Sequence, residues 1–94
     1  MAEVLTAEHF LPHEQKIFRV KGGAHALKLS HVETFAMKGA ARQAFNLIFA
    51  GPPGDVLPEG LYTLQVENGP EFELYVMPVH TPTPGQQDYQ SLFN

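Results

Sequence analysis

Apolar and polar residues alternate along much of the chain, and this alternation predicts a β-rich fold. It is clearest over residues 62–67 and 71–76, where every second residue is apolar. Successive side chains of a strand point to opposite faces of the sheet, so both segments are predicted to be half-buried strands. Shorter patterns of the same kind predict further strands over residues 17–21, 24–35, 43–50 and 89–94. We therefore expect a mainly β fold, a small antiparallel barrel or sandwich of roughly five to seven strands.

One short helix is predicted before the first strand. Thr6 is a good N-cap for a helix from Ala7 to Leu11, and Leu5 and Phe10 have the spacing of a hydrophobic staple across that cap. Pro12 opposes any extension, because its ring and its missing N–H are incompatible with a helix interior. The helix should be one or two turns long.

The long second strand is expected to contain an irregularity. Leu27 and Leu29 share one face, whereas Val32 has the opposite parity. Both ends can face the core only if the strand has a bulge or bend near Ser30 and His31. Residues 43–50 are apolar on one face and partly apolar on the other, which is typical of a strand covered on both sides.

Turn residues separate these segments. Small residues over 37–41 predict a loop, the Pro- and Gly-rich stretch 51–60 predicts a rigid turn, and residues 78–87 predict a connector. A two-residue Asn68-Gly69 hairpin turn would place Val66 opposite Glu71 and so mix a core residue with a carboxylate on one face. We therefore predict a wider loop over 67–71, which pairs Val66 with Phe72 and Leu64 with Leu74.

The shared parity of three successive strands defines the predicted core. Its members are Phe45, Leu47, Phe49, Tyr62, Leu64, Phe72, Leu74 and Val76.

Length and composition indicate one domain over residues 1–94. The chain has 94 residues, of which 44% are hydrophobic, enough for one small core. It has no cysteine, so disulfides and thiolate metal sites are excluded. The N-terminus has no basic region followed by an apolar one, and no apolar run approaches a membrane span of ~18–20 residues. We expect no signal peptide, no membrane partner, and a protein that is cytoplasmic or part of a particle assembled in the cytoplasm.

Charge is unevenly distributed along the sequence. Residues 1–50 hold all six basic side chains and four glutamates, a net +2, whereas residues 51–94 hold six acidic side chains and no Lys or Arg, a net −6. Such polarity can orient a protein contact, unless the strands interleave and mix the charges. A net charge of −4 with scattered lysines argues against a nucleic-acid partner.

The five histidines do not predict a metal site. His9 and His13 have the i, i+4 spacing of a helical pair, but Pro12 interrupts that helix. His25 and His31 share a strand face, yet six residues of strand separate them by about 20 Å. Surface or capping roles fit these residues better.

The sequence has few residues arranged as in known catalytic motifs. Neither serine, Ser30 or Ser91, lies in a nucleophile elbow. The Gly51–Gly54 loop lacks the Lys and Ser/Thr of a phosphate-binding loop. Glu67, Glu71 and Glu73 could form a carboxylate cluster, but their outward parity favours a solvated strand face. We predict no catalytic residue, no metal and no cofactor.

Six residues are candidates for a protein contact because acidic, aromatic and Met side chains recur in the last two strands. They are Glu71, Glu73, Tyr75, Met77, Tyr89 and Phe93. Plain core packing explains the aromatic ones equally well.

Almost the whole chain resembles a family of uncharacterised bacterial proteins of about this length, a domain of unknown function. The matching segments are residues 5–10, 42–45 with Leu47 and Phe49, 51–52, 57–64, 78–79 and 89–94. The sequence departs from that pattern at the Asn68-Gly69-Pro70 turn and at His80. The resemblance implies genomic neighbours of the phage-tail-collar type, and with them an accessory role in a tail-like particle and no catalysis.

Two classes of function are compatible with the sequence. The first is a non-enzymatic β-domain that binds another protein or itself, as an interaction or structural accessory module. The second is a small-molecule-binding barrel, or an enzyme that uses glutamate and histidine in a pocket. A filled core with an exposed apolar edge would favour the first, and a closed cavity containing His and Glu would favour the second.

Overall fold

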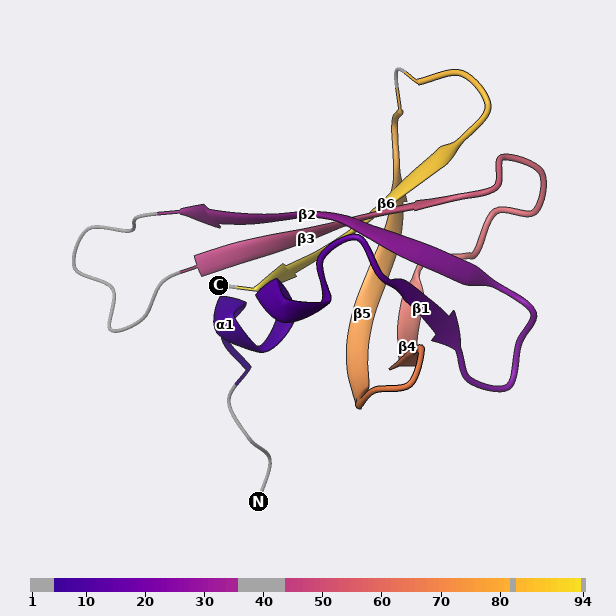
Figure 1. The fold of residues 1–94 in the computed structure, drawn as a ribbon. Coiled ribbons are helices and arrows are strands. Elements are labelled where there is room, and N and C mark those ends of the chain that lie inside the picture. The colour runs from indigo at the N-terminus through magenta and orange to yellow at the C-terminus, as the bar shows by residue number, and fades with distance from the viewer. Residues whose placement is uncertain (1–4, 36–43, 82, 94) are drawn as a thin grey trace.

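Six antiparallel strands close into a barrel, with a short helix at its N-terminal side (Figure 1). The computed structural model describes residues 5–35, 44–81 and 83–93. Its elements are α1 (Ala7–Phe10), the 3-10 turn η1 (Leu11–His13), β1 (Ile17–Val20), β2 (Ala26–Phe35), β3 (Ala44–Gly51), β4 (Gly60–Val66), β5 (Glu71–Val79) and β6 (Gln87–Phe93). The strand order is β1-β2-β3-β6-β5-β4, and β4 pairs back onto β1. The predicted mainly β fold is confirmed, and it is a barrel.

The short helix was predicted correctly to within one residue. Thr6 is its N-cap, and the Thr6 N–H donates to Nδ1 of His9 at 2.9 Å. The helix ends at Phe10, and Pro12 lies in the 3-10 turn that follows. Phe10 is fully buried, and Leu5 packs against the core beside it. The main contribution of the helix is thus to insert Phe10 into the barrel.

The predicted bulge in β2 is confirmed. Pairing of β2 with β3 shifts register between Leu29 and His31. Side chains of the preceding turn bind backbone groups at this shift. Gln15 Nε2 donates to the carbonyl of Ser30, the residue without a β3 partner, at 2.7 Å, and the Val32 N–H donates to Glu14 Oε2 at 3.1 Å. The bulge is therefore held by side chains from the segment before β1.

The register predicted for the β4–β5 hairpin is wrong by two residues. Leu64 lies opposite Phe72 and Tyr62 opposite Leu74, and the loop has only three residues, Glu67 to Gly69. A shift of two leaves every side chain on its face, so parity alone could not distinguish the two registers. The tighter loop forms because Asn68 adopts a left-handed conformation with φ of 59°. The rejected two-residue turn is indeed absent from this hairpin.

The connector between β5 and β6 is shorter than the predicted 78–87. β5 continues through Pro78 to Val79, and β6 begins at Gln87. Pro78 lies beyond Val76, the last β5 residue that pairs with β4, so its missing N–H removes no bond from that ladder. The loop predicted at 37–41 lies outside the described residues.

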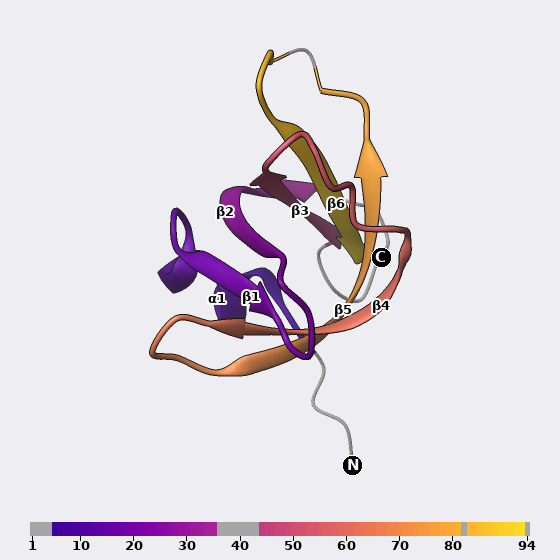
Figure 2. The same ribbon diagram turned by 90° about the vertical axis from the view of Figure 1, so that its right-hand side faces the viewer.

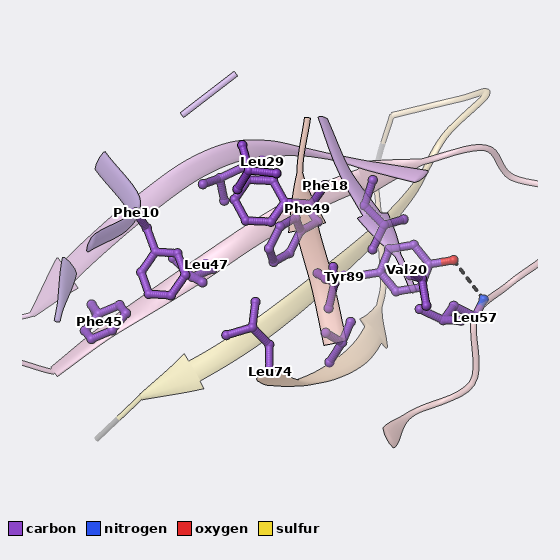
Figure 3. Close-up of a cluster of buried hydrophobic side chains, with 14 of the residues drawn as sticks. Phe10, Phe18, Val20, Leu29, Phe45, Leu47, Phe49, Leu57, Leu74 and Tyr89 are labelled. Atoms are coloured by element: carbon purple, nitrogen blue, oxygen red, sulfur yellow. Dashed lines mark hydrogen bonds between the residues drawn. The ribbon is translucent and has the colours of Figure 1, made fainter. Parts of the chain in front are cut away.

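Side chains fill the interior of the barrel (Figure 3). Six of the eight predicted core residues are at most 2% exposed, and Tyr62 and Phe72 are half-buried and pack against the others. The same buried cluster also contains Phe10, Phe18, Leu27, Leu29, Val66 and Tyr89, together with Ala7, Val20 and Leu57. Phe10 lies 4.6 Å from Phe72 and 5.9 Å from both Phe45 and Phe93 between ring centroids, so α1 contributes an aromatic plug to this core.

Candidate functional site

The outer face of the β4–β5 hairpin exposes a large apolar pair. Leu61 lies directly opposite Tyr75 on the neighbouring strand, and the two residues are 61% and 48% exposed. The Tyr75 hydroxyl donates to the carboxylate of Glu59, and this hydrogen bond, with smaller effects of desolvation and of the Glu59 charge, raises the pKa of Tyr75. The tyrosine ring is thereby fixed beside Leu61 on the surface.

Four of the predicted contact residues lie on β5 with this pair. Glu71, Glu73 and Tyr75 are exposed, and Met77 is half-buried where β5 meets β6. Gln90 of β6 donates from Nε2 to the Met77 sulfur at 3.5 Å.

The other two predicted contact residues are core residues. Tyr89 is 1% exposed, and Phe93 is half-buried and stacked on Phe45 with ring centroids 4.5 Å apart. Both rings are therefore packed on the core side of β6 and do not lie on the outer face with Tyr75. The physical reason is parity, because Ser91 between them is also buried while Leu92 is 50% exposed.

Leu61 is an exposed apolar residue that the sequence-based set of contact candidates did not include. It shares the outward parity of Thr63 and Gln65, and that signal was readable in the alternation of β4.

One edge of β5 is not paired with another described strand over most of its length. β5 pairs with β6 only from Met77 to Val79, whereas its first six residues pair with β4 alone. In both views β5 and β6 lie close near the C-terminal end of β5 and diverge towards its N-terminal end (Figures 1 and 2). Among the described strands, none pairs with this edge before Met77.

The alternation of an antiparallel ladder identifies the backbone groups on that edge. The Val66 N–H donates to the Pro70 carbonyl at 2.9 Å, so Val66 and Pro70 form a hydrogen-bonded pair. Hydrogen-bonded and non-hydrogen-bonded pairs alternate, which makes Glu71, Glu73 and Tyr75 the β5 residues whose N–H and C=O point away from β4. Two hydrogen bonds on the other side of β4 agree with this assignment. The Lys21 N–H donates to the Thr63 carbonyl and the Glu67 N–H donates to the Ile17 carbonyl, so the odd-numbered residues Thr63 and Glu67 face β1 and not β5. We call residues Glu71 to Tyr75 on this side the open edge of β5.

A cleft of about 460 Å³ adjoins the open edge. Its lining comes from the helical segment on one side and the start of β5 on the other: Leu5, His9, His13, Pro70, Glu71 and Phe72. The structure thus brings together His9 and His13, which the sequence could not place relative to one another.

The two histidines of the cleft make contacts that support the fold. The Nδ1 of His9 accepts the Thr6 N–H, which fulfils the predicted capping role. The His13 ring meets Phe18 edge-on at 6.4 Å and lies 6.1 Å from Phe72, with a buried Nδ1 that has no partner among the described residues. Burial, and secondarily the positive charge of Lys16, lowers the pKa of His13. No group of three or more His, Asp or Glu side chains in the described ranges has the geometry to hold a metal ion.

The charge polarity of the sequence is partly cancelled by strand pairing. Because β1 lies beside β4, Arg19 reaches Glu67 at 3.4 Å and Lys21 reaches Glu71 at 2.8 Å. These pairs mix the basic and acidic halves, which is the alternative that the sequence left open. Glu73, by contrast, has no ion pair within residues 5–35, 44–81 and 83–93.

Within the described part of the chain, no helix is long and apolar enough to cross a membrane.

Comparison with known proteins identifies the family. No curated protein and no solved structure matches the chain. One family model matches residues 5–93, which is nearly the whole chain and includes the helix, all six strands and the open edge. The chain therefore belongs to the family described as a domain of unknown function, DUF6916.

Proposed function

We propose that this barrel is a non-enzymatic protein-interaction module whose contact surface is the outer face of β4 and β5. The observation that carries the proposal is the exposed cross-strand pair of Leu61 and Tyr75. Large apolar and aromatic side chains rimmed by charge are typical of the centre of a protein contact. Here the rim consists of the exposed residues Glu59, Glu71 and Glu73.

The packing of the barrel supports a surface role. Interior positions are occupied by Phe, Leu, Val and Tyr side chains, several of them with no exposed surface. A filled interior leaves the outer face and the strand edge as the places where a macromolecule can bind. We extend the proposal to an accessory role in a phage-tail-like assembly, for which the family resemblance of the sequence is the support.

Binding kinetics of single variants test the proposal. A partner is first recovered from the native host by cross-linking and mass spectrometry, and its association with the purified protein is then followed by surface plasmon resonance. Leu61→Ser should weaken binding by about tenfold or more if Leu61 is at the centre of the contact. Glu71→Lys with Glu73→Lys should slow association and change its salt dependence, because rim charges act mainly on encounter.

The matched control is Val56→Ser. Val56 is 43% exposed but lies in the loop before β4, outside the proposed surface. The proposal requires that Val56→Ser binds like wild type while Leu61→Ser does not. Equal affinity of the Leu61 variant and wild type for every recovered partner would contradict it.

A further inference from the structure

The open edge of β5 indicates which kind of partner segment the surface accepts. Three residues, Glu71, Glu73 and Tyr75, point their backbone N–H and C=O groups away from β4, and no hydrogen bond among the described residues uses those groups. A row of unpaired donors and acceptors is a template for another strand. Addition of an extended peptide to such an edge gives affinity through main-chain bonds and specificity through alternate side chains.

The charge of the edge disfavours pairing with a second copy of this chain around its two glutamates. An antiparallel pair of two β5 edges centred on Glu73 would place that residue opposite its own copy, and one centred on Phe72 would place Glu71 opposite Glu73. Like charges directly opposite one another destabilise a pair of strands. Basic side chains at the same positions would instead form favourable cross-strand pairs, and Glu73 has no competing ion pair in the described residues.

The cleft beside the edge has room for a side chain of an added strand that points inward. A residue opposite Phe72 would share its inward parity and point towards the space lined by Leu5, His9, His13 and Phe72. Apart from the two imidazole rings and the Glu71 carboxylate at the edge itself, that lining is apolar and aromatic. An apolar side chain suits this position, since it would extend the aromatic cluster around Phe10.

We propose that the open edge of β5 binds an extended segment of a partner protein as an added antiparallel strand, with Lys or Arg opposite Glu71 and Glu73 and an apolar residue between them in the cleft. This inference rests on the proposed interaction function and gives the chemical class of the partner. An alternating basic and apolar segment is the expected ligand.

Model peptides test the proposal without any variant of the protein. The probe is acetyl-Lys-Val-Lys-Val-Lys-amide, titrated into the labelled protein and followed by amide NMR. Methylation of the three lysine amides, which face β5 in the proposed pairing, should weaken binding by about tenfold or more, because each removed donor loses a main-chain bond. Methylation of the two valine amides, which face away, should leave affinity within about threefold, and the acidic peptide acetyl-Glu-Val-Glu-Val-Glu-amide should bind at least about tenfold more weakly than the probe.

Two protein variants complete the test. Glu73→Pro removes an N–H that faces the edge and takes no part in the β4 ladder, so it should abolish peptide binding while the amide spectrum keeps the dispersion of the fold. Glu73→Lys should weaken binding of the basic peptide, whereas Glu67→Gln, in the hairpin loop and off the edge, should not. Strand addition is overturned if the two methylated peptides bind equally or if the basic peptide fails to bind.

The outcomes separate this inference from the proposed function. Suppose that Leu61→Ser loses the natural partner while peptide binding ignores the methylation pattern. Strand addition would then be wrong and the interaction surface would stand. If natural-partner binding responds neither to Leu61→Ser nor to Glu73→Pro, both proposals are wrong.

Discussion

Tyr89 binds the loop before β4 from inside the barrel. Its hydroxyl oxygen accepts the backbone N–H of Leu57 at 2.9 Å, and the two residues are 1% and 4% exposed (Figure 3). A buried N–H without a partner is costly, so this single bond fixes the path of the Pro- and Gly-rich loop against β6.

Tyr89→Phe is therefore expected to lower the free energy of unfolding by about 1–3 kcal/mol, because the Leu57 N–H would stay buried without an acceptor. Urea denaturation followed by circular dichroism measures the change. The control is Tyr75→Phe, which removes an exposed hydroxyl that bonds Glu59 and should stay within about 0.5 kcal/mol of wild type. Equal changes in the free energy of unfolding for the two substitutions would show that the buried hydrogen bond stabilises the fold no more than the exposed one.

Two leucines of β4 should differ sharply when truncated. Leu64 has no exposed surface, whereas Leu61 is 61% exposed. Leu64→Ala should cost about 2–5 kcal/mol through lost transfer free energy and a residual cavity, and Phe45→Ala at 2% exposure should cost about 3–5 kcal/mol. Leu61→Ala should cost less than about 0.5 kcal/mol. Chemical denaturation checks all three, and a small effect at both Leu64 and Phe45 would contradict the assignment of the core face.

His13 should make stability depend on pH. Its folded-state pKa is lowered from 6.5, first by burial and then by Lys16. Below pH 6.5 the unfolded state therefore binds more protons than the folded state, so the stability contributed by neutral His13 is present above that pH and is lost as the pH falls through the folded-state pKa.

Denaturation midpoints measured between about pH 7 and pH 5 test this dependence, since the unfolded histidine titrates in that window. His13→Gln should flatten the curve relative to wild type. His80→Gln, at an exposed position, serves as the control and should follow the wild-type curve. A curve for His13→Gln parallel to that of wild type would exclude His13 as the cause.

Amide exchange should alternate along β5. The N–H groups of Phe72 and Leu74 face β4 and should be protected, whereas those of Glu73 and Tyr75 face the open edge and should exchange much faster. Hydrogen exchange observed by NMR resolves the four residues individually. Uniform protection from Phe72 to Tyr75 would mean that the edge is covered in solution.

The class of fold and part of the core could be predicted from the order of residues alone. Alternation of period two predicts strands because it depends only on strand geometry, and the parities of β3, β4 and β5 identified six fully buried residues. The β2 bulge could be predicted for the same reason, since Leu29 and Val32 can both face inward only if the register changes between them. The ends of the helix could be predicted because Thr6 caps its N-terminus and Pro12 opposes its extension.

The register of the β4–β5 hairpin and the surroundings of individual side chains depend on contacts across the barrel. Registers that differ by two residues place every side chain on the same face, so alternation cannot distinguish them. The left-handed conformation of Asn68, which allows the three-residue loop, selects the observed register. Tyr89 and Phe93 carried the same aromatic signal as Tyr75, yet β6 buries Tyr89 in the core and packs the half-buried Phe93 against it. The open edge of β5, the cleft beside it and the ion pairs across β1 and β4 arise from contacts between residues far apart in the sequence. Strand alternation encodes which face a side chain occupies, but which neighbour it meets is set by strand order and by where two strands diverge.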